Sequence, residues 1–189
     1  MAKLIYVANV SLDSYIEDAH GRFDWTAPGD EVFTFITDLV RPVGTYLYGR
    51  GLYETMVLWE TDPTLAAQSE LSADFANIWQ TADKIVYSTT LGAVSTANTR
   101  LERRFDPNAV RDMKTSAGGD LTVGGSTLAA HAFDAGLVDE CHLLVYPVLV
   151  GAGKPAFLSD ARVQLELQDE HRFGSGVMYL RYGRQQQAA

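Results

Sequence analysis

The turn Gly49-Arg50-Gly51 is a first place where the chain could hold a phosphate group. It follows the β-prone run 45–48 and precedes residues that can open a helix, so its backbone N–H groups are free to face an anion. Glycines permit the close approach of an anion, and Arg50 can bind it with two hydrogen bonds. The alternative is an ordinary strand-to-helix turn that carries a solvated arginine.

A second turn of this kind, Gly124-Gly125, follows the β-prone run 121–123 and precedes a predicted helix. The free N–H groups, the positive end of the helix dipole and the hydroxyls of Ser126 and Thr127 all suit a phosphate. Two such turns in one small chain are stronger evidence than either alone. We therefore expect them to converge on a common trough that accepts a diphosphate.

A third glycine-rich run, residues 151–156, matches the dinucleotide-binding pattern G-x-G-x-x-A. That pattern works when a long helix follows and points its N-terminus at the pyrophosphate. Here Pro155 lies inside the run, no long helix is predicted after it, and too few residues remain to build a Rossmann domain. We interpret this run as a turn at a strand end.

Hydrophobic periodicity predicts the elements that must position these turns. Runs rich in β-branched and aromatic residues predict strands, and apolar residues three and four positions apart predict helices. The predicted strands are 3–10, 45–48, 84–88, 121–123, 138–150, 163–173 and 177–182. The predicted helices are 30–40, 71–82, 106–116 and 126–135, and residues 59–70 are expected to form a loop.

The order of these elements predicts an α/β fold, because βα units come first and a run of strands follows. The mostly parallel sheet would end in an antiparallel C-terminal edge. No linker-like stretch or internal repeat divides the chain. We therefore expect one domain over residues 1–184 and a disordered tail over residues 185–189.

The composition limits the partners and the location of the protein. The 189 residues carry a formal net charge of −9, and the only basic cluster is Arg100, Arg103 and Arg104. This charge disfavours nucleic acid and anionic membranes as partners, although a few local donors can still hold a phosphate. The chain has no run long enough to span a membrane and no export signal, so a cytoplasmic location is expected.

A metal site is not expected either. Cys141 is the only cysteine, which excludes an intrachain disulfide and a cysteine-based zinc site. The four histidines are far apart in the sequence and match no metal-ligand spacing.

Several motifs occur in an order that is similar to that of a known family. They are Ser11-Leu12-Asp13-Ser14-Tyr15-Ile16, the Gly49-Arg50 turn, the run 84–91, the turn 123–126 and, most specifically, residues 146–157. Over nearly its whole length the chain resembles the dihydrofolate-reductase-like superfamily. Within it, the chain is similar to the C-terminal reductase domain of bacterial bifunctional riboflavin-biosynthesis deaminase-reductases and to their stand-alone relatives.

The resemblance implies a dihydrofolate-reductase-like three-layer sandwich, a homodimer, and NADPH lying across the strand ends of a mainly parallel sheet. It implies that Ala8, Asn9 and Ile16 contact the nicotinamide. It further implies that the pyrophosphate and the adenosine phosphate are held by Gly49, Arg50, Gly51 and Leu52. The adenine ribose would lie near Ser88, Thr89 and Thr90. The pyrophosphate and the nicotinamide would be covered by Gly124, Gly125, Ser126, Thr127 and Leu128.

The chain departs from the family pattern at three points. Thr89 stands where the family often has an arginine near the 2′-phosphate, so NADH is an alternative to NADPH. Ser14 replaces the usual glycine after Asp13, so the backbone of that loop can differ. The zinc deaminase domain of the bifunctional proteins is excluded here by the single cysteine.

Two carboxylates are candidates for catalytic residues, because hydride transfer also needs a proton and a bound substrate. Asp13 follows the first strand, near the implied nicotinamide site. Asp30 follows Trp25 with a spacing that resembles the one by which folate reductases place their pterin-binding acid. The alternatives are an ordinary turn carboxylate for Asp13 and a helix N-cap for Asp30.

Aromatic and basic residues in the predicted loops offer further contacts. Phe23, Trp25 and Trp59 could stack on a planar substrate, or they could fill the core. The arginine cluster 100–104 could neutralise a substrate phosphate, or it could form a solvated face.

The leading hypothesis is an NAD(P)H-dependent reductase, preferably using NADPH, that acts on a small pterin-, pyrimidine- or ribosylamine-like substrate. In this it would be similar to a 5-amino-6-(5-phosphoribosylamino)uracil reductase of riboflavin biosynthesis. One alternative is a ligand-binding or regulatory protein that kept the fold without turnover. Another alternative is a dihydrofolate reductase.

Overall fold

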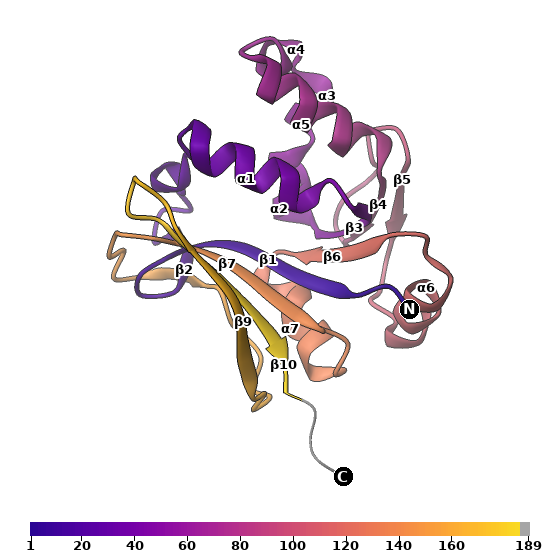
Figure 1. Cartoon of the computed structure of the whole chain (residues 1–189). Helices are drawn as coiled ribbons and strands as arrows, with labels where there is room; N and C mark the ends of the chain where they lie inside the picture. The colour runs from indigo at the N-terminus through magenta and orange to yellow at the C-terminus, as the bar shows by residue number, and fades with distance from the viewer. Residues whose placement is uncertain (186–189) are drawn as a thin grey trace.

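The computed structural model describes residues 1–185, and an eight-stranded sheet runs through them (Figure 1). The spatial order of its strands is β5-β4-β3-β6-β1-β7-β10-β9. The strands are β1 (Leu4–Ser11), β3 (Val43–Gly49), β4 (Asp83–Tyr87), β5 (Thr99–Glu102), β6 (Asp120–Gly124), β7 (Glu140–Tyr146), β9 (Leu165–Arg172) and β10 (Met178–Arg184). Residues 186–189 of the predicted tail lie outside the described part of the chain.

The strands from β5 to β7 are parallel, whereas β10 is antiparallel to both β7 and β9. The predicted α/β fold, a mostly parallel sheet with an antiparallel C-terminal edge, is therefore confirmed. The carboxyl ends of six parallel strands meet at one edge of the sheet, which is where ligands bind in open α/β sheets.

Helices cover both faces of the sheet, which gives three layers (Figure 1). On one face lie α1 (Asp30–Val40), α2 (Arg50–Met56), α3 (Leu58–Thr61), α4 (Pro63–Ala66) and α5 (Glu70–Thr81). On the other face lie α6 (Pro107–Ser116) and α7 (Ser126–Asp134), which pack on β1 and β6. The core on each face consists of apolar side chains, such as Tyr6, Leu121 and Ala132 on the side of α7 and Trp79 and Val86 on the side of α5.

The glycine-rich run 151–156 forms part of a small second sheet. Its strand β8 (Gly153–Pro155) pairs antiparallel with β2 (Tyr15–Asp18). Gly153 has φ +144, and an added Cβ would collide with the backbone of β2, so only glycine fits there. No helix follows the run within the described residues up to 185, and the dinucleotide-fingerprint alternative is therefore excluded for it.

Some predicted elements were wrong in extent. Residues 59–70 contain the short helices α3 and α4 instead of a continuous loop, because Asp62 caps α4 through the N–H of Thr64. The predicted strand 138–150 is β-structured only as far as Tyr146. Strands β2, β5 and β8, of three or four residues each, had no periodic signal in the sequence.

Candidate active site

The two glycine turns lie side by side at the carboxyl edge of the sheet. Strand β3 pairs with β6 in a register that places Tyr48 opposite Gly124. A Cβ added to Gly125 would lie 3.9 Å from the backbone N of Gly49. The two backbone segments that the sequence singled out therefore meet along one edge.

Gly125 is the N-cap of α7 and has φ +88, a conformation that side chains rarely tolerate. The next residue, Ser126, is fully buried, and its hydroxyl has no hydrogen-bond partner within residues 1–185. A buried polar group of this kind usually has a partner. A polar ligand group at this turn fits that unfilled hydrogen-bonding capacity.

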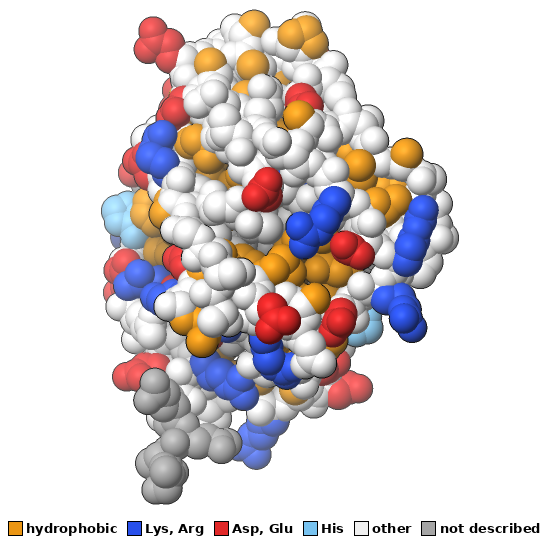
Figure 2. Space-filling model, turned by 90° about the vertical axis from the view of Figure 1, so that its right-hand side faces the viewer, with side chains coloured by type: hydrophobic (Ala, Val, Ile, Leu, Met, Phe, Trp, Pro, Cys, Tyr) orange, Lys and Arg blue, Asp and Glu red, His pale blue; other side chains and the backbone are white. Residues whose placement is uncertain are grey.

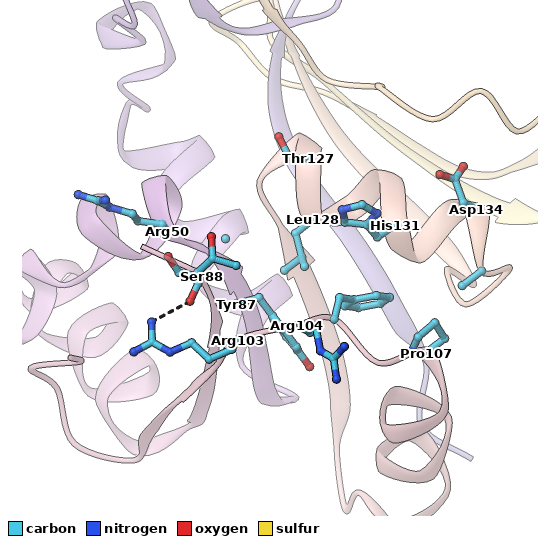
Figure 3. A pocket seen from close by; sticks show the side chains of 14 residues that line it. Arg50, Tyr87, Ser88, Arg103, Arg104, Pro107, Thr127, Leu128, His131 and Asp134 are labelled. Carbon is cyan, nitrogen blue, oxygen red and sulfur yellow. Dashed lines mark hydrogen bonds between the residues drawn. The ribbon is translucent and has the colours of Figure 1, made fainter. Parts of the chain in front are cut away.

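A cleft of about 700 Å³ opens beside these turns, between the carboxyl ends of β3, β4 and β5 and helix α7 (Figure 3). Its lining residues are Gly49, Arg50, Tyr87, Ser88, Thr89, Arg103, Arg104, Phe105, Pro107, Thr127, Leu128, His131, Asp134 and Ala135. This volume is in the range of ordinary ligand pockets. On the face that Figure 2 shows, apolar side chains occupy the middle and charged side chains surround them.

The cleft brings together some of the predicted cofactor residues but not all of them. Gly49, Arg50, Ser88, Thr89, Thr127 and Leu128 line it. Gly51, Leu52, Thr90, Gly124, Gly125 and Ser126 adjoin these residues in the chain without lining the cleft. Ala8, Asn9 and Ile16 lie elsewhere, in β1 and β2.

Much of the other wall of the cleft was not predicted from the sequence. Tyr87, Phe105 and His131 line the cleft, and the rings of Phe105 and His131 are stacked with centroids 6.2 Å apart. Burial raises the pKa of Tyr87 to about 12, so its hydroxyl stays protonated. The only sequence signal was the basic cluster 100–104, and without a predicted β5 nothing indicated on which side of the sheet it lies.

Hydrogen bonds hold the loop after β4 in a fixed shape. The Ser88 hydroxyl accepts from the N–H groups of Thr90 (3.2 Å) and Leu91 (3.0 Å). Arg103 donates to the carbonyls of Ser88 (3.1 Å) and Leu91 (2.6 Å), as Figure 3 shows for Ser88. At the end of the neighbouring strand β3, Arg50 donates to the Glu54 carboxylate (2.7 Å) and to the Thr90 hydroxyl of this loop (3.1 Å).

A second, smaller hollow of about 260 Å³ lies between the start of α1 and the ends of β7 and β10. It is lined by Trp25, Ala27, Gly29, Val32, Tyr146, Pro147, Val148, Ser175 and Val177. Trp25 belongs to the 3-10 helix η1 (Asp24–Thr26), and its ring meets that of Tyr146 edge to face at 6.1 Å. Within residues 1–185 neither the indole N–H of Trp25 nor the hydroxyl of Tyr146 has a hydrogen-bond partner.

Asn9 faces the same side of the sheet as this hollow. It pairs with Leu144, and Ser11 pairs with Tyr146, so the four side chains share the face that α1 covers. Ala8 points the opposite way, into the core below α7. Only the backbone of Ala8 is therefore available to a ligand on the α1 side.

Asp13 is tied into a network of donors. Its carboxylate accepts from the Ser11 hydroxyl (2.6 Å) and from the backbone N–H groups of Val150 (3.1 Å) and Gly151 (2.7 Å). The hydrogen bond from Ser11, followed by those from the two amides, lowers the pKa of Asp13 to about 2. Asp13 is thus ionised at neutral pH, where it can hold a loop but has no proton to give.

Asp30 is the first residue of α1, and the N-cap is Gly29. Within residues 1–185 no side chain caps this helix, so the alternative that Asp30 is its N-cap is wrong. The carboxylate is exposed and lies beside Gly29, which lines the smaller hollow. Of the other aromatic candidates, Trp59 packs on Phe75 with centroids 4.7 Å apart, which makes it a core residue.

Some other features are absent from the described part of the chain. Residues 1–185 contain no group of three or more His, Cys, Asp or Glu side chains arranged to hold a metal ion. None of their helices is both long and apolar enough to cross a bilayer.

The eight-stranded sheet with its antiparallel edge, and a cleft at the carboxyl ends of its parallel strands, define an α/β protein of the dihydrofolate-reductase-like fold. The chain belongs to the RibD C-terminal domain family, whose model matches residues 2–179. The resemblance stated from the sequence motifs is therefore confirmed.

Known proteins are similar to this chain at low sequence identity. The uncharacterized protein YyaP of Bacillus subtilis (strain 168) is 27% identical over 182 residues, which cover 95% of this chain and 94% of YyaP. A candidate riboflavin biosynthesis protein from Shewanella sp. PV-4 is 21% identical, with a TM-score of 0.78 over 98% of this chain and 100% of that chain.

A larger relative is the diaminohydroxyphosphoribosylaminopyrimidine deaminase/5-amino-6-(5-phosphoribosylamino)uracil reductase from Thermotoga maritima. It is 15% identical, with a TM-score of 0.65 over 97% of this chain but only 56% of that chain. Our chain therefore corresponds to about half of that protein. Membership of the RibD C-terminal domain family supports a reductase-like role, and the solved structures support the fold.

Proposed function

We propose that the protein is an NADPH-dependent reductase that transfers hydride to a small pterin-, pyrimidine- or ribosylamine-like substrate. The observation that carries the proposal is the pair of glycine turns, Gly49–Gly51 and Gly124-Gly125, which lie side by side next to a cleft of about 700 Å³. Membership of the RibD C-terminal domain family supports the same reaction class. When bound, the cofactor supplies the hydride.

The residues present fit such a cofactor. We assign the pyrophosphate and adenosine phosphate to Gly49, Arg50, Gly51 and Leu52, the adenine ribose to Ser88, Thr89 and Thr90, and the pyrophosphate and nicotinamide to Gly124, Gly125, Ser126, Thr127 and Leu128. The unpartnered hydroxyl of Ser126 and the glycine-only backbone at Gly125 support this assignment. We assign the nicotinamide end also to the Ala8 backbone, Asn9 and Ile16.

The substrate belongs, in this proposal, to the smaller hollow beside α1. Trp25 offers a ring face for stacking and an indole N–H that lacks a hydrogen-bond partner within residues 1–185. The hydroxyl of Tyr146 also lacks a hydrogen-bond partner within these residues. Leaving such groups unpaired costs about 1–3 kcal/mol each, so a polar heterocycle that satisfies them gains affinity and orientation. Asp30 at the rim is the substrate-side carboxylate of this proposal.

Asp13 acts in this proposal as a positioning residue. Its ionised carboxylate fixes Val150 and Gly151 next to the end of β1, where the reacting rings would meet. The proton that accompanies hydride transfer then comes from water, because Asp13 is already deprotonated.

The test is an assay with NADPH that carries deuterium at the transferred position of the nicotinamide. Purified protein is incubated with a panel of ribosylaminopyrimidines and pterins, dihydrofolate included. We expect one ribosylaminopyrimidine or pterin product to gain a single deuterium while NADPH is oxidised. NADPH binding without product from any substrate would instead support the ligand-binding alternative, and turnover of dihydrofolate alone would support a dihydrofolate reductase.

A further inference from the structure

The large cleft is locally basic although the whole chain has a net charge of −9. Three arginines line it, Arg50, Arg103 and Arg104, against one carboxylate, Asp134. Asp134 lies on α7, where it accepts a hydrogen bond from the Ser159 hydroxyl at 2.6 Å. An excess of positive charge on one wall of a cleft favours an anionic ligand.

The three arginines differ in how far their charge is already compensated. Arg50 forms an ion pair with Glu54 at 2.7 Å. Arg103 donates to the carbonyls of Ser88, Leu91 and Gly92, which shapes the loop without neutralising the charge.

Arg104 is the arginine of the cleft that is most available to a ligand. Its exposed guanidinium makes no hydrogen bond or ion pair within the part of the chain that the structure describes. Figure 3 shows it between Arg103 and Pro107, on the opposite side of the cleft from His131. Thr89, which lines the same cleft, is exposed, and neither its hydroxyl nor its backbone N–H donates a hydrogen bond within residues 1–185.

The position of Arg104 in the sheet limits what it can bind. It follows β5, which is three strand positions from β6 and its turn Gly124-Gly125. At about 4.8 Å per strand this separation is roughly 14 Å, farther than an arginine side chain reaches. A pyrophosphate held at that turn therefore lies out of range, and Arg104 meets the adenosine end of a nucleotide in the same cleft.

We propose that Arg104, supported by Arg103 and the donors of Thr89, binds a phosphate monoester on the ribose of a bound adenine nucleotide. A monoester is a dianion with several acceptor oxygens, and it matches two uncompensated guanidinium groups and a free N–H. This inference rests on the proposed cofactor function, and it makes Arg104 the residue that selects NADPH over NADH.

The test measures binding by calorimetry without any turnover. Adenosine 2′,5′-bisphosphate and adenosine 5′-monophosphate are titrated into the whole chain and into the variants Arg104→Gln and Arg100→Gln. We expect the bisphosphate to bind the unmodified chain more tightly than the monophosphate. Arg104→Gln should weaken the binding of the bisphosphate by about 10–100-fold and leave the affinity for the monophosphate unchanged.

Arg100→Gln is the matched control, because Arg100 contacts Glu102 and Met113 and does not line the cleft. It should leave both affinities unchanged. Equal affinity for the two nucleotides, or equal losses in both variants, would overturn the role of Arg104. Binding of ribose 5-phosphate that depends on Arg104 would also overturn it, because the phosphate would then belong to a substrate.

Failure of this inference is distinguishable from failure of the proposed function. Preferential binding of the bisphosphate without hydride transfer to any substrate would contradict only the reductase activity. Hydride transfer with equal use of NADPH and NADH in the unmodified chain would contradict only the role of Arg104. Binding of neither nucleotide would contradict both.

Discussion

At the scale of single residues, Asp13 joins two loops that are far apart in the sequence. We expect Asp13→Asn to remove the ionic acceptor of the Val150 and Gly151 amides, because an amide oxygen is a weaker acceptor than a carboxylate. Hydrogen exchange of these two amides, followed by mass spectrometry or NMR, should become about 10–100-fold faster. The control Asp62→Asn acts on another loop. Unchanged exchange of the two amides in Asp13→Asn would contradict the role of Asp13 in joining the loops.

His142 gives a pH-dependent prediction. Burial lowers its pKa from the usual 6.5, against the opposing effect of Glu140, whose carboxylate lies 2.9 Å from the ring. Because the folded pKa is the lower one, the unfolded chain takes up the proton first as the pH falls. The contribution of His142 to the free energy of unfolding is therefore complete above pH 6.5, and it is lost as the pH falls towards the folded pKa.

The measurement is the free energy of urea unfolding at several pH values between neutral and mildly acidic. His142 alone should remove up to about 1.4 kcal/mol per pH unit below its unfolded pKa. The variant His142→Gln can still bond to Tyr179 and Glu140 but does not titrate. Its stability should fall less steeply, and parallel curves for both proteins would refute the assignment.

The position of some candidate site residues in the fold could be predicted where residue type alone carried the signal. Arg50 and the glycines at 49, 124 and 125 stand next to apolar strands, so their place at strand ends was readable. Arg104 was considered only as part of the cluster 100–104, for a substrate phosphate or a solvated face, because its place beside the cleft depends on a short strand, half of whose residues are exposed. The two backbone donors to Asp13 come from residues 137 and 138 positions away, and no local pattern encodes them.

At the scale of elements, the start of α7 depends on Gly125. Its φ of +88 makes Gly125→Ala strained, at a cost of about 1–3 kcal/mol. We expect a lower melting temperature and weaker NADPH binding, because the turn must rotate its N–H groups to relieve the strain. Gly118→Ala is the control, since an added Cβ there meets no atom within 4 Å. Equal effects of both substitutions on NADPH binding would contradict the role of the turn.

The predictability of an element followed its length and burial. Strands β1, β3, β4 and β6 are mostly buried runs of five to eight residues, and the sequence predicted each of them. Strands β2 and β8 were missed because they are short and consist of half-buried or exposed residues paired only with each other. Helix α4 was missed because four residues do not define a periodic face.

At the scale of the whole molecule, the edge strand β9 supports the expected homodimer. All eight of its residues are exposed, including Leu165 and Leu167, and an unpaired edge offers backbone groups to a second copy. Light scattering at micromolar concentration should give twice the chain mass of 20.7 kDa. Leu167→Lys should shift the mass towards the monomer, and a monomeric unmodified chain would refute the dimer.

The class of the fold could be predicted at this scale, but the neighbours in the sheet could not. The change from βα units to consecutive strands indicated a parallel sheet with an antiparallel edge. The insertion of β1 between β6 and β7, and of β6 between β3 and β1, brings together strands from distant parts of the sequence. This order decides that the turns after Tyr48 and Val123 are adjacent, and periodicity within a strand contains no information about it.

The central claim, that the paired glycine turns hold a nicotinamide dinucleotide, is tested most directly by titrating the protein with NADPH and following the nicotinamide fluorescence. We predict a saturable change with one molecule bound per chain, which Gly125→Ala weakens and Gly118→Ala leaves unchanged. A signal that rises linearly with NADPH without saturation, in protein shown to be folded, would contradict the account.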